Sequence, residues 1–238
     1  MDGRARACHN RGMKPVRTCL LLLALGACTS TTAPPPVTTA PADTGAAWYQ
    51  SAAQAGAKVY RIDSALSLIT VTVRRGGALA RFGHDHVVAT RDVKGLVAPD
   101  AGRADFHFRL DAMSVDQPEL RVAAGLDTQP SAEAIAGTRT NMLTRVLEAE
   151  RFPLVMLRVE RLPGAADKVR LEVTLHGVTR TAEVPVHIER GKTSISASGQ
   201  LTLKQTDFGI TPMSVMAGAM VVQDQMELKF KIVAGTAR

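Results

Sequence analysis

Apolar residues recur at every second position over much of the chain between residues 103 and 232. This alternation predicts β-strands with one apolar and one polar face, because successive side chains of a strand point to opposite sides of the sheet. The clearest runs are residues 103–110, 168–176, 183–189, 194–204 and 225–232. Further strands are predicted at Leu66–Arg74, Ala78–Phe82, His86–Ala98 and Leu154–Leu162.

Strands of this kind favour antiparallel pairing, because parallel sheets are usually covered on both faces. Glycine-containing turns at residues 75–77, 163–164 and 190–191 separate them. One segment differs: residues 131–150 show apolar positions at helical spacing, and Pro153 prevents the helix from continuing. Many strands of this length close most naturally into a barrel, which removes exposed edges. The pattern predicts an all-β fold, a single antiparallel β-barrel with one inserted helical segment.

The N-terminal residues have the features of an export signal. Five basic residues precede a short apolar run, residues 19–25, which ends in Leu25-Gly26-Ala27-Cys28. The run is too short to span a bilayer, and small residues follow it, as in signal peptides. Leucine, two small residues and cysteine resemble the lipobox of bacterial lipoproteins, where the cysteine is acylated and the chain is cleaved before it. We expect a lipoprotein signal peptide over residues 1–27 and lipidation of Cys28. An ordinary secretory peptide with an incidental cysteine is the alternative.

A lipidated Cys28 would determine where the protein resides. Diacyl attachment together with an acylated amine exceeds the two signals that stable anchoring requires. We therefore expect a periplasmic protein whose membrane partner is the bacterial inner or outer membrane, bound through Cys28.

Removal of the signal peptide changes the charge balance. The chain has 29 Lys and Arg against 22 Asp and Glu, and residues 1–27 hold five and one of these, which leaves 24 against 21, a net charge of +3. Most of the basicity therefore belongs to targeting, and no nucleic-acid partner is expected. Cys28 is the only cysteine after residue 27, so no intramolecular disulfide is expected either.

Residues 28–57 differ in composition from the rest of the chain. Threonine, alanine and proline dominate, and no apolar periodicity is visible. Such a stretch buries too little apolar surface to offset its ordering entropy, so we expect a disordered tether. Trp48 and Tyr49 near its end could contact either the folded domain or the lipid interface. The folded domain is expected over residues 58–238, which is long enough to build a core.

Five segments of this domain are informative in their order and spacing: Tyr60–Asp63, Asn141–Leu154, Leu171–Pro185, Thr206–Ile210 and Val222–Ile232. They include the stretches Leu175-His176-Gly177-Val178-Thr179-Arg180 and Asp207-Phe208-Gly209-Ile210. Together these segments resemble the YceI-like polyisoprenoid-binding family, in which the first of the two stretches corresponds to a hairpin. No single motif is specific, but together they span the domain.

The resemblance implies a lipocalin-like barrel that holds a long isoprenoid chain. The expected ligand is thus an isoprenoid or another long apolar lipid, for example a quinone precursor, and no cofactor is expected. The stretch Phe82-Gly83-His84-Asp85-His86 departs from the family pattern and is typical of a histidine-containing subgroup. The predicted ligand-binding residues are Phe82, His84, His86, Phe106, Phe108, Arg139, Met142, Val173, Leu175, Ala197 and Leu201.

The free energy of burying such a ligand limits how the protein could acquire it. Burying a chain of about forty carbons at ~0.8 kcal/mol per group gives on the order of 30 kcal/mol relative to water. This value exceeds the ceiling of measured affinities. The lipid would therefore pass from membrane hydrocarbon to barrel hydrocarbon, a nearly neutral exchange in which shape and head-group contacts provide the selectivity.

His84 and His86 are the most distinctive candidate side chains. Two residues apart on a strand, both imidazoles would face the same side and could supply two ligands to a divalent ion. A metal site also needs a third donor, and His107, His176 and His187 are candidates by type only. Hydrogen bonds to backbone and to Asp85, or a contact with a lipid head group, are the alternatives. We predict a structural or head-group role and no metal site.

The remaining polar candidates give little support for catalysis. Arg139, beside Met142, could pair with a phosphate or quinone-precursor head group if it faces the barrel mouth; a solvated arginine is the plainer interpretation. No Ser/His/Asp set, carboxylate pair or CxxC motif stands out, so no catalytic residues are expected and the protein is not predicted to be an enzyme. Two hypotheses remain: a lipid carrier or store, and a metal-dependent or redox protein that uses His84 and His86.

Overall fold

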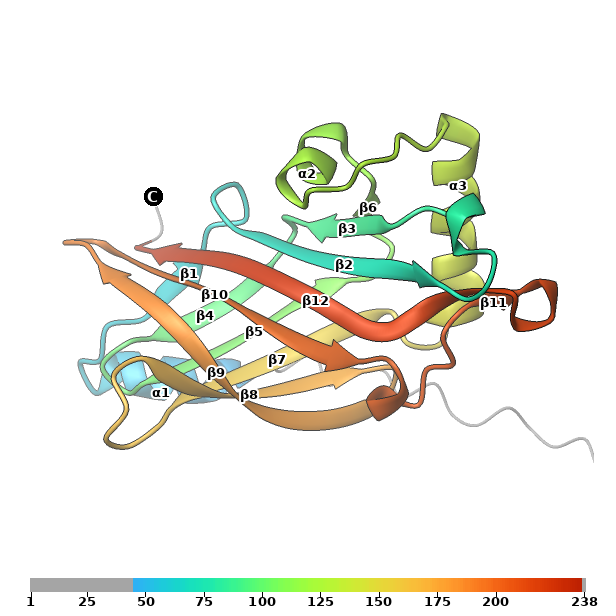
Figure 1. Ribbon diagram of the computed structural model, residues 1–238. Helices are drawn as coiled ribbons and strands as arrows, with labels where there is room; N and C mark the ends of the chain where they lie inside the picture. Colours follow the sequence, from blue (N-terminus) through green and yellow to red (C-terminus); the bar gives the residue numbers. More distant parts are fainter. Residues whose placement is uncertain (1–44, 237–238) are drawn as a thin grey trace, which may run out of the picture. The chain divides into compact units, whose positions relative to one another are not determined.

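The computed structural model describes residues 45–236, and in these residues twelve strands join in one antiparallel sheet (Figure 1). The strands are β1 (Tyr60–Ile62), β2 (Leu68–Gly76), β3 (His86–Thr90), β4 (Lys94–Ala98), β5 (Arg103–Arg109), β6 (Ser114–Val115), β7 (Leu154–Arg161), β8 (Lys168–Leu175), β9 (Val178–Arg190), β10 (Ser194–Lys204), β11 (Ser214–Val215) and β12 (Met220–Gly235). The helices are α1 (Ala46–Gln54), α2 (Pro118–Ala123) and α3 (Ala132–Asn141), with short helical turns η1 (Ala80–Phe82), η2 (Met142–Val146), η3 (Thr206–Phe208) and η4 (Met216–Gly218).

The sheet closes on itself through the short strand β1. Its Arg61 is paired with Leu96 of β4 on one side and with Gly235 of β12 on the other. The ring runs β1-β4-β5-β7-β8-β9-β10-β12, eight strands, and returns to β1. Further along the same edge of β12, the pairing partner is β2 instead of β1. Strand β3 pairs with β2, and β6 pairs with β3. The predicted all-β antiparallel barrel is confirmed.

Two of the predicted strands are wrong in detail. Residues 78–82 form a tight turn and the 3₁₀ turn η1, because Gly77 adopts a φ of 87° and the Leu79 N–H donates to the carbonyl of Ala219 instead of to a strand partner. Residues 86–98 form two strands, because a turn closed by Val93 N–H and the carbonyl of Arg91 separates β3 from β4.

The inserted helical segment is present but composite. Ser131 caps α3 by accepting a hydrogen bond from the Ala134 N–H, and the helix continues into the wider turn η2. Helix α2, which begins at Pro118, was not predicted; six residues give too short a pattern to detect. α1 and α3 lie at opposite ends of the barrel (Figure 1).

The prediction of a disordered tether is also wrong for its C-terminal part, because residues 46–54 form α1. Tyr49 is buried, and its hydroxyl donates to Asp105 of β5 over 2.9 Å. The same carboxylate accepts from Arg103 (2.6 Å) and Arg158 (2.8 Å). Burial, and the hydrogen bond to Asp105, raise the pKa of the Tyr49 hydroxyl. Trp48 packs edge-on against Tyr49 and under the Arg103 guanidinium, so these aromatic residues contact the domain.

The rest of the predicted tether and the signal peptide, with Cys28, lie outside the described residues. Within residues 45–236, no helix is both long and apolar enough to cross a membrane.

The Tyr49 anchor gives a first test. Tyr49→Phe keeps the ring but removes the hydrogen bond to a charged acceptor, so we expect a loss of about 1–3 kcal/mol in the free energy of unfolding. Chemical denaturation would measure it. Tyr60→Phe is the matched control, because Tyr60 is also buried but its hydroxyl makes no hydrogen bond within residues 45–236. An equal loss in both variants would contradict an anchoring role for the Tyr49 hydroxyl.

Candidate functional site: the barrel cavity

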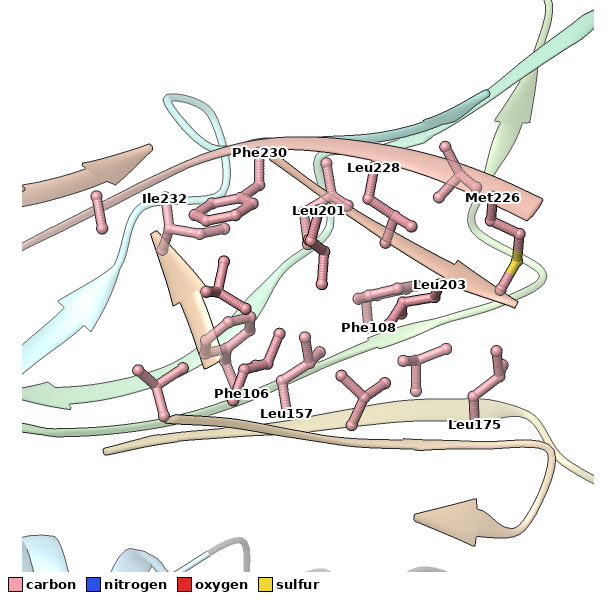
Figure 2. Close-up of a pocket in the computed structure, with 18 of the residues that line it drawn as sticks. Phe106, Phe108, Leu157, Leu175, Leu201, Leu203, Met226, Leu228, Phe230 and Ile232 are labelled. Atoms are coloured by element: carbon pink, nitrogen blue, oxygen red, sulfur yellow. The ribbon is translucent and has the colours of Figure 1, made fainter. Parts of the chain in front are cut away.

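The inward faces of the strands enclose a cavity of about 720 Å³. Figure 2 shows Phe106, Phe108, Leu157 and Leu175 on one side of it, facing side chains of β10 and β12 on the other. The opposite wall consists of Leu201, Leu203, Met226, Leu228, Phe230 and Ile232. The period-two pattern of each strand thus supplies an apolar wall.

Two small residues of β10 shape the interior in different ways. Ala197 and Gly199 belong to the inward series of this strand, between Ile195 and Leu201. A Cβ added at Gly199 would lie 2.8 Å from Cζ of Phe230, so only glycine leaves room for that ring. The Phe230 ring therefore occupies the space in front of Gly199, whereas Ala197 lies on the cavity wall.

The volume and the chemistry of the walls indicate the occupant. At about 24 cal/mol per Å³, leaving a void of this size dry and unfilled would cost on the order of 17 kcal/mol, comparable with the whole stability of a domain. Walls made of aliphatic and phenyl groups offer water few hydrogen bonds, so hydrocarbon is favoured. At about 30 Å³ for a group the size of a water molecule, the cavity accommodates roughly two dozen such groups.

Most of the predicted ligand-binding residues lie on the cavity wall, although their role in binding stays a prediction. They come from β3, β5, β8, β10 and the segment after α3. The lining includes His86, Phe106, Phe108, Met142, Val173, Leu175, Ala197 and Leu201.

Three predicted residues do not line the cavity. Phe82 is 64% exposed, in η1, with the Arg81 guanidinium over its ring. Arg139 donates to the backbone carbonyls of Asp111 (2.6 Å) and Met113 (3.5 Å). It therefore fastens α3 to the chain after β5, and it is not among the residues that line the cavity. His84 lies before β3, outside the alternation that points His86 inward.

The two histidines have different surroundings. His86 Nδ1 is 2.6 Å from Oδ2 of Asp116, and the predicted partner Asp85 instead accepts from the Arg75 N–H (2.8 Å) and from Arg74. The imidazole of His84 stands 6.3 Å from that of His86, and its buried Nδ1 has no hydrogen-bond partner in the described part of the chain. In that same part, no group of three His, Cys, Asp or Glu side chains could hold a metal ion.

Asp116 and Arg121 were missed by sequence reasoning. Both side chains are almost fully buried, and Arg121 Nη1 donates to Asp116 Oδ1 over 2.6 Å. Burial alone would raise the pKa of the Asp116 carboxyl, but hydrogen bonds from His86 and the Val87 N–H hold it below its ordinary value. This stabilisation is present above the unfolded pKa and is lost as the pH falls through the folded one. The only signal in the sequence is an acid two residues before the proline that begins a helix.

Comparisons with known proteins agree with this architecture. The family model described as the YceI-like domain matches residues 60–234. A polyisoprenoid-binding domain from Saccharophagus degradans, implicated in plant cell wall breakdown, has a similar fold, with a TM-score of 0.54 and 14% identity over 75% of this chain and 98% of that one. BcnA of Burkholderia cenocepacia is also similar, with a TM-score of 0.50 and 14% identity over 72% and 98%. No curated protein matches the sequence.

A cavity-filling substitution tests whether the interior is open. Ala197→Trp would occupy space in the cavity, so we expect the delipidated variant to unfold within about 1 kcal/mol of the parent while the lipid extracted with it decreases.

The matched control is Ala89→Trp, in the small second core formed with Val87, Leu120 and Leu126. There the added ring overpacks and should cost ~1–3 kcal/mol or more. Thermal unfolding and organic extraction of both variants provide the comparison. If Ala197→Trp destabilises the protein as much as Ala89→Trp does, the interior is packed and not open.

Proposed function

This chain belongs to the YceI-like family, and from that premise we propose that it is a membrane-tethered, periplasmic lipid-binding protein. It holds an isoprenoid-type chain, for example a quinone precursor, inside the barrel for carriage or storage. The observation that carries the proposal is the apolar cavity of about 720 Å³ within a closed barrel. The similarity in fold to a domain named as polyisoprenoid-binding supports the ligand class.

The energetics favour loading from a membrane. Filling the cavity with roughly two dozen hydrocarbon groups at ~0.8 kcal/mol each gives on the order of 20 kcal/mol relative to water, which is near the ceiling of measured affinities. A lipid that comes from a bilayer gains little of this transfer free energy, because it leaves one hydrocarbon medium for another. Exchange therefore stays reversible when donor and barrel are close, and a lipid on Cys28 would hold them close.

Exposed apolar side chains gather at one end of the barrel. Three of the six large hydrophobic residues that are exposed within residues 45–236 belong to η1, β11 and η4: Phe82, Val215 and Met216. We call these three residues the apolar lip. These segments are in contact, because the Leu79 N–H just before η1 donates a hydrogen bond to the carbonyl oxygen of Ala219 just after η4. Arg81 lies 4.5 Å from the centre of the Phe82 ring, a combination of cation and apolar groups that suits an anionic membrane surface.

The anchoring part of the proposal has a direct test. Cys28→Ser should release the protein from the membrane fraction into the periplasmic extract with its thermal unfolding unchanged, because Cys28 lies 32 residues before β1. Fractionation followed by a high-salt wash is the measurement. A variant that still sediments with membranes after that wash would show that lipidation of Cys28 is not the anchor.

The ligand itself is identified by extraction. Protein purified from its own host should release an apolar compound of several hundred daltons into organic solvent, and native mass spectrometry should show the same mass on the intact chain. A stoichiometric metal with no lipid would instead favour the metal-dependent or redox alternative built on His84 and His86.

The apolar lip can be tested separately from binding. In the Cys28→Ser background, Phe82→Ser with Met216→Ser should slow lipid transfer from vesicles of phosphatidylethanolamine and phosphatidylglycerol severalfold and leave equilibrium binding unchanged. The control is Leu66→Ser with Val122→Ser, which removes two similarly exposed side chains elsewhere. Equal transfer rates in the two double variants would rule out a role for the lip.

A further inference from the structure

His86 is held in one orientation by a buried ion pair. Its Nδ1 lies 2.6 Å from Asp116 Oδ2, while Asp116 Oδ1 accepts from the Val87 N–H (3.0 Å) and from Arg121 (2.6 Å). The side chains of Asp116 and Arg121 are 0% and 1% exposed, against 14% for His86. The carboxylate is therefore enclosed, and the imidazole lies between it and the cavity.

The guanidinium of Arg121 is itself fully engaged. It donates to the backbone carbonyl of Asp85 (2.8 Å), to that of Thr128 and to the Thr128 hydroxyl (3.0 Å). Asp85 is next to His86 in sequence, so the same arginine fixes both the backbone before the imidazole and the carboxylate behind it. Buried pairs of this kind add little net stability compared with apolar residues, and their best-attested use is to specify one geometry. Here the geometry specified is that of the His86 ring.

This arrangement determines which ring atom remains for a ligand. An ionised carboxylate has only lone pairs, so Nδ1 carries the proton that is shared with Asp116. His86 lines the cavity, and within residues 45–236 its Nε2 has no hydrogen-bond partner. A neutral imidazole held in this way presents the Nε2 lone pair, an acceptor, in a wall that is otherwise almost entirely hydrocarbon. The other uncharged polar residues of the lining are Thr138 and Asn141 of α3, which packs on β6 beside β3, and Ser196 and Gln205.

We propose that His86 is the head-group contact of the cavity and that it accepts a hydrogen bond, through Nε2, from a hydroxyl at the polar end of the bound lipid. The ligand class is thus a long-chain isoprenoid alcohol or an isoprenylated phenol. Asp116 and Arg121 are positioning residues, which act through His86. This inference rests on the proposed function, since it requires a lipid in the barrel, and it adds the chemistry of the head group.

The test compares two probes, geranylgeraniol and its methyl ether. In the ether a methyl group replaces the hydroxyl hydrogen, so the donor is lost. Each has about the number of heavy atoms that the cavity accommodates. Delipidated protein should bind the alcohol roughly three- to tenfold more tightly than the ether, the value of one hydrogen bond. In His86→Phe the ratio should fall to about one, while the affinity for the ether stays within about twofold. His187→Phe, at an exposed histidine on the outer face, should keep the parent ratio.

A measurement on the parent protein covers the case in which His86→Phe does not fold. The ¹⁵N resonance of His86 Nε2 should shift when geranylgeraniol is added and stay unchanged with the ether. If both probes bind the parent with equal affinity, or if the preference survives in His86→Phe, His86 is not the head-group contact. If neither probe binds, the proposed function itself fails, so the two failures are distinguishable.

Discussion

Closure of the sheet through β1 is the constraint on which the rest of the structure depends. Tyr60 and Arg61 pair with β4, and Arg61 and Ile62 pair with β12, which converts a curved sheet with two free edges into a ring. Once the ring exists, every strand must turn one face toward a common interior, and the period-two sequences make that face apolar. Eight strands give an interior wide enough to hold a small ligand. The short side chain of Ala197 leaves part of that space open, while the Phe230 ring occupies the space in front of Gly199.

Two buried carboxylates secure the additions to this ring. Asp105 accepts hydrogen bonds from Tyr49, Arg103 and Arg158, and so attaches α1 to the outside of β5. Asp116 accepts from His86, the Val87 N–H and Arg121, and so attaches α2 to the start of β3. In both places the carboxylate is surrounded by donors from three directions, which keeps its pKa below the ordinary value although burial acts in the opposite direction. Both clusters reach the cavity lining, the first through Arg103 and the second through His86.

The hydrocarbon chain and the polar head group of the ligand contribute differently to binding. The hydrocarbon part gains almost nothing from moving between bilayer and barrel, so apolar area cannot provide selectivity. An acceptor that is held in one orientation in a mostly hydrocarbon wall can provide selectivity, because leaving a buried polar group unpaired costs more than pairing it gains. The ion pair behind His86 is a means of keeping that acceptor in place without water. The apolar lip at the end of the barrel formed by η1, β11 and η4 would let the chain pass between the two media without crossing solvent.

The sequence by itself determined most of the long strands, their inward faces and the all-β barrel, because a period of two is a local property of the chain. It also placed Phe106, Phe108, Val173 and Leu175 on the wall, since each belongs to an alternating run. It failed where partners distant along the chain decide: Tyr49 is ordered by Asp105, 56 residues away, and His86 is oriented by Asp116, 30 residues away. Arg139 was considered as either a head-group contact or a solvated side chain, because nothing local shows that the carbonyls of Asp111 and Met113 take up its donors. Those contacts exist only after the ring has closed, so they were decided by the tertiary structure.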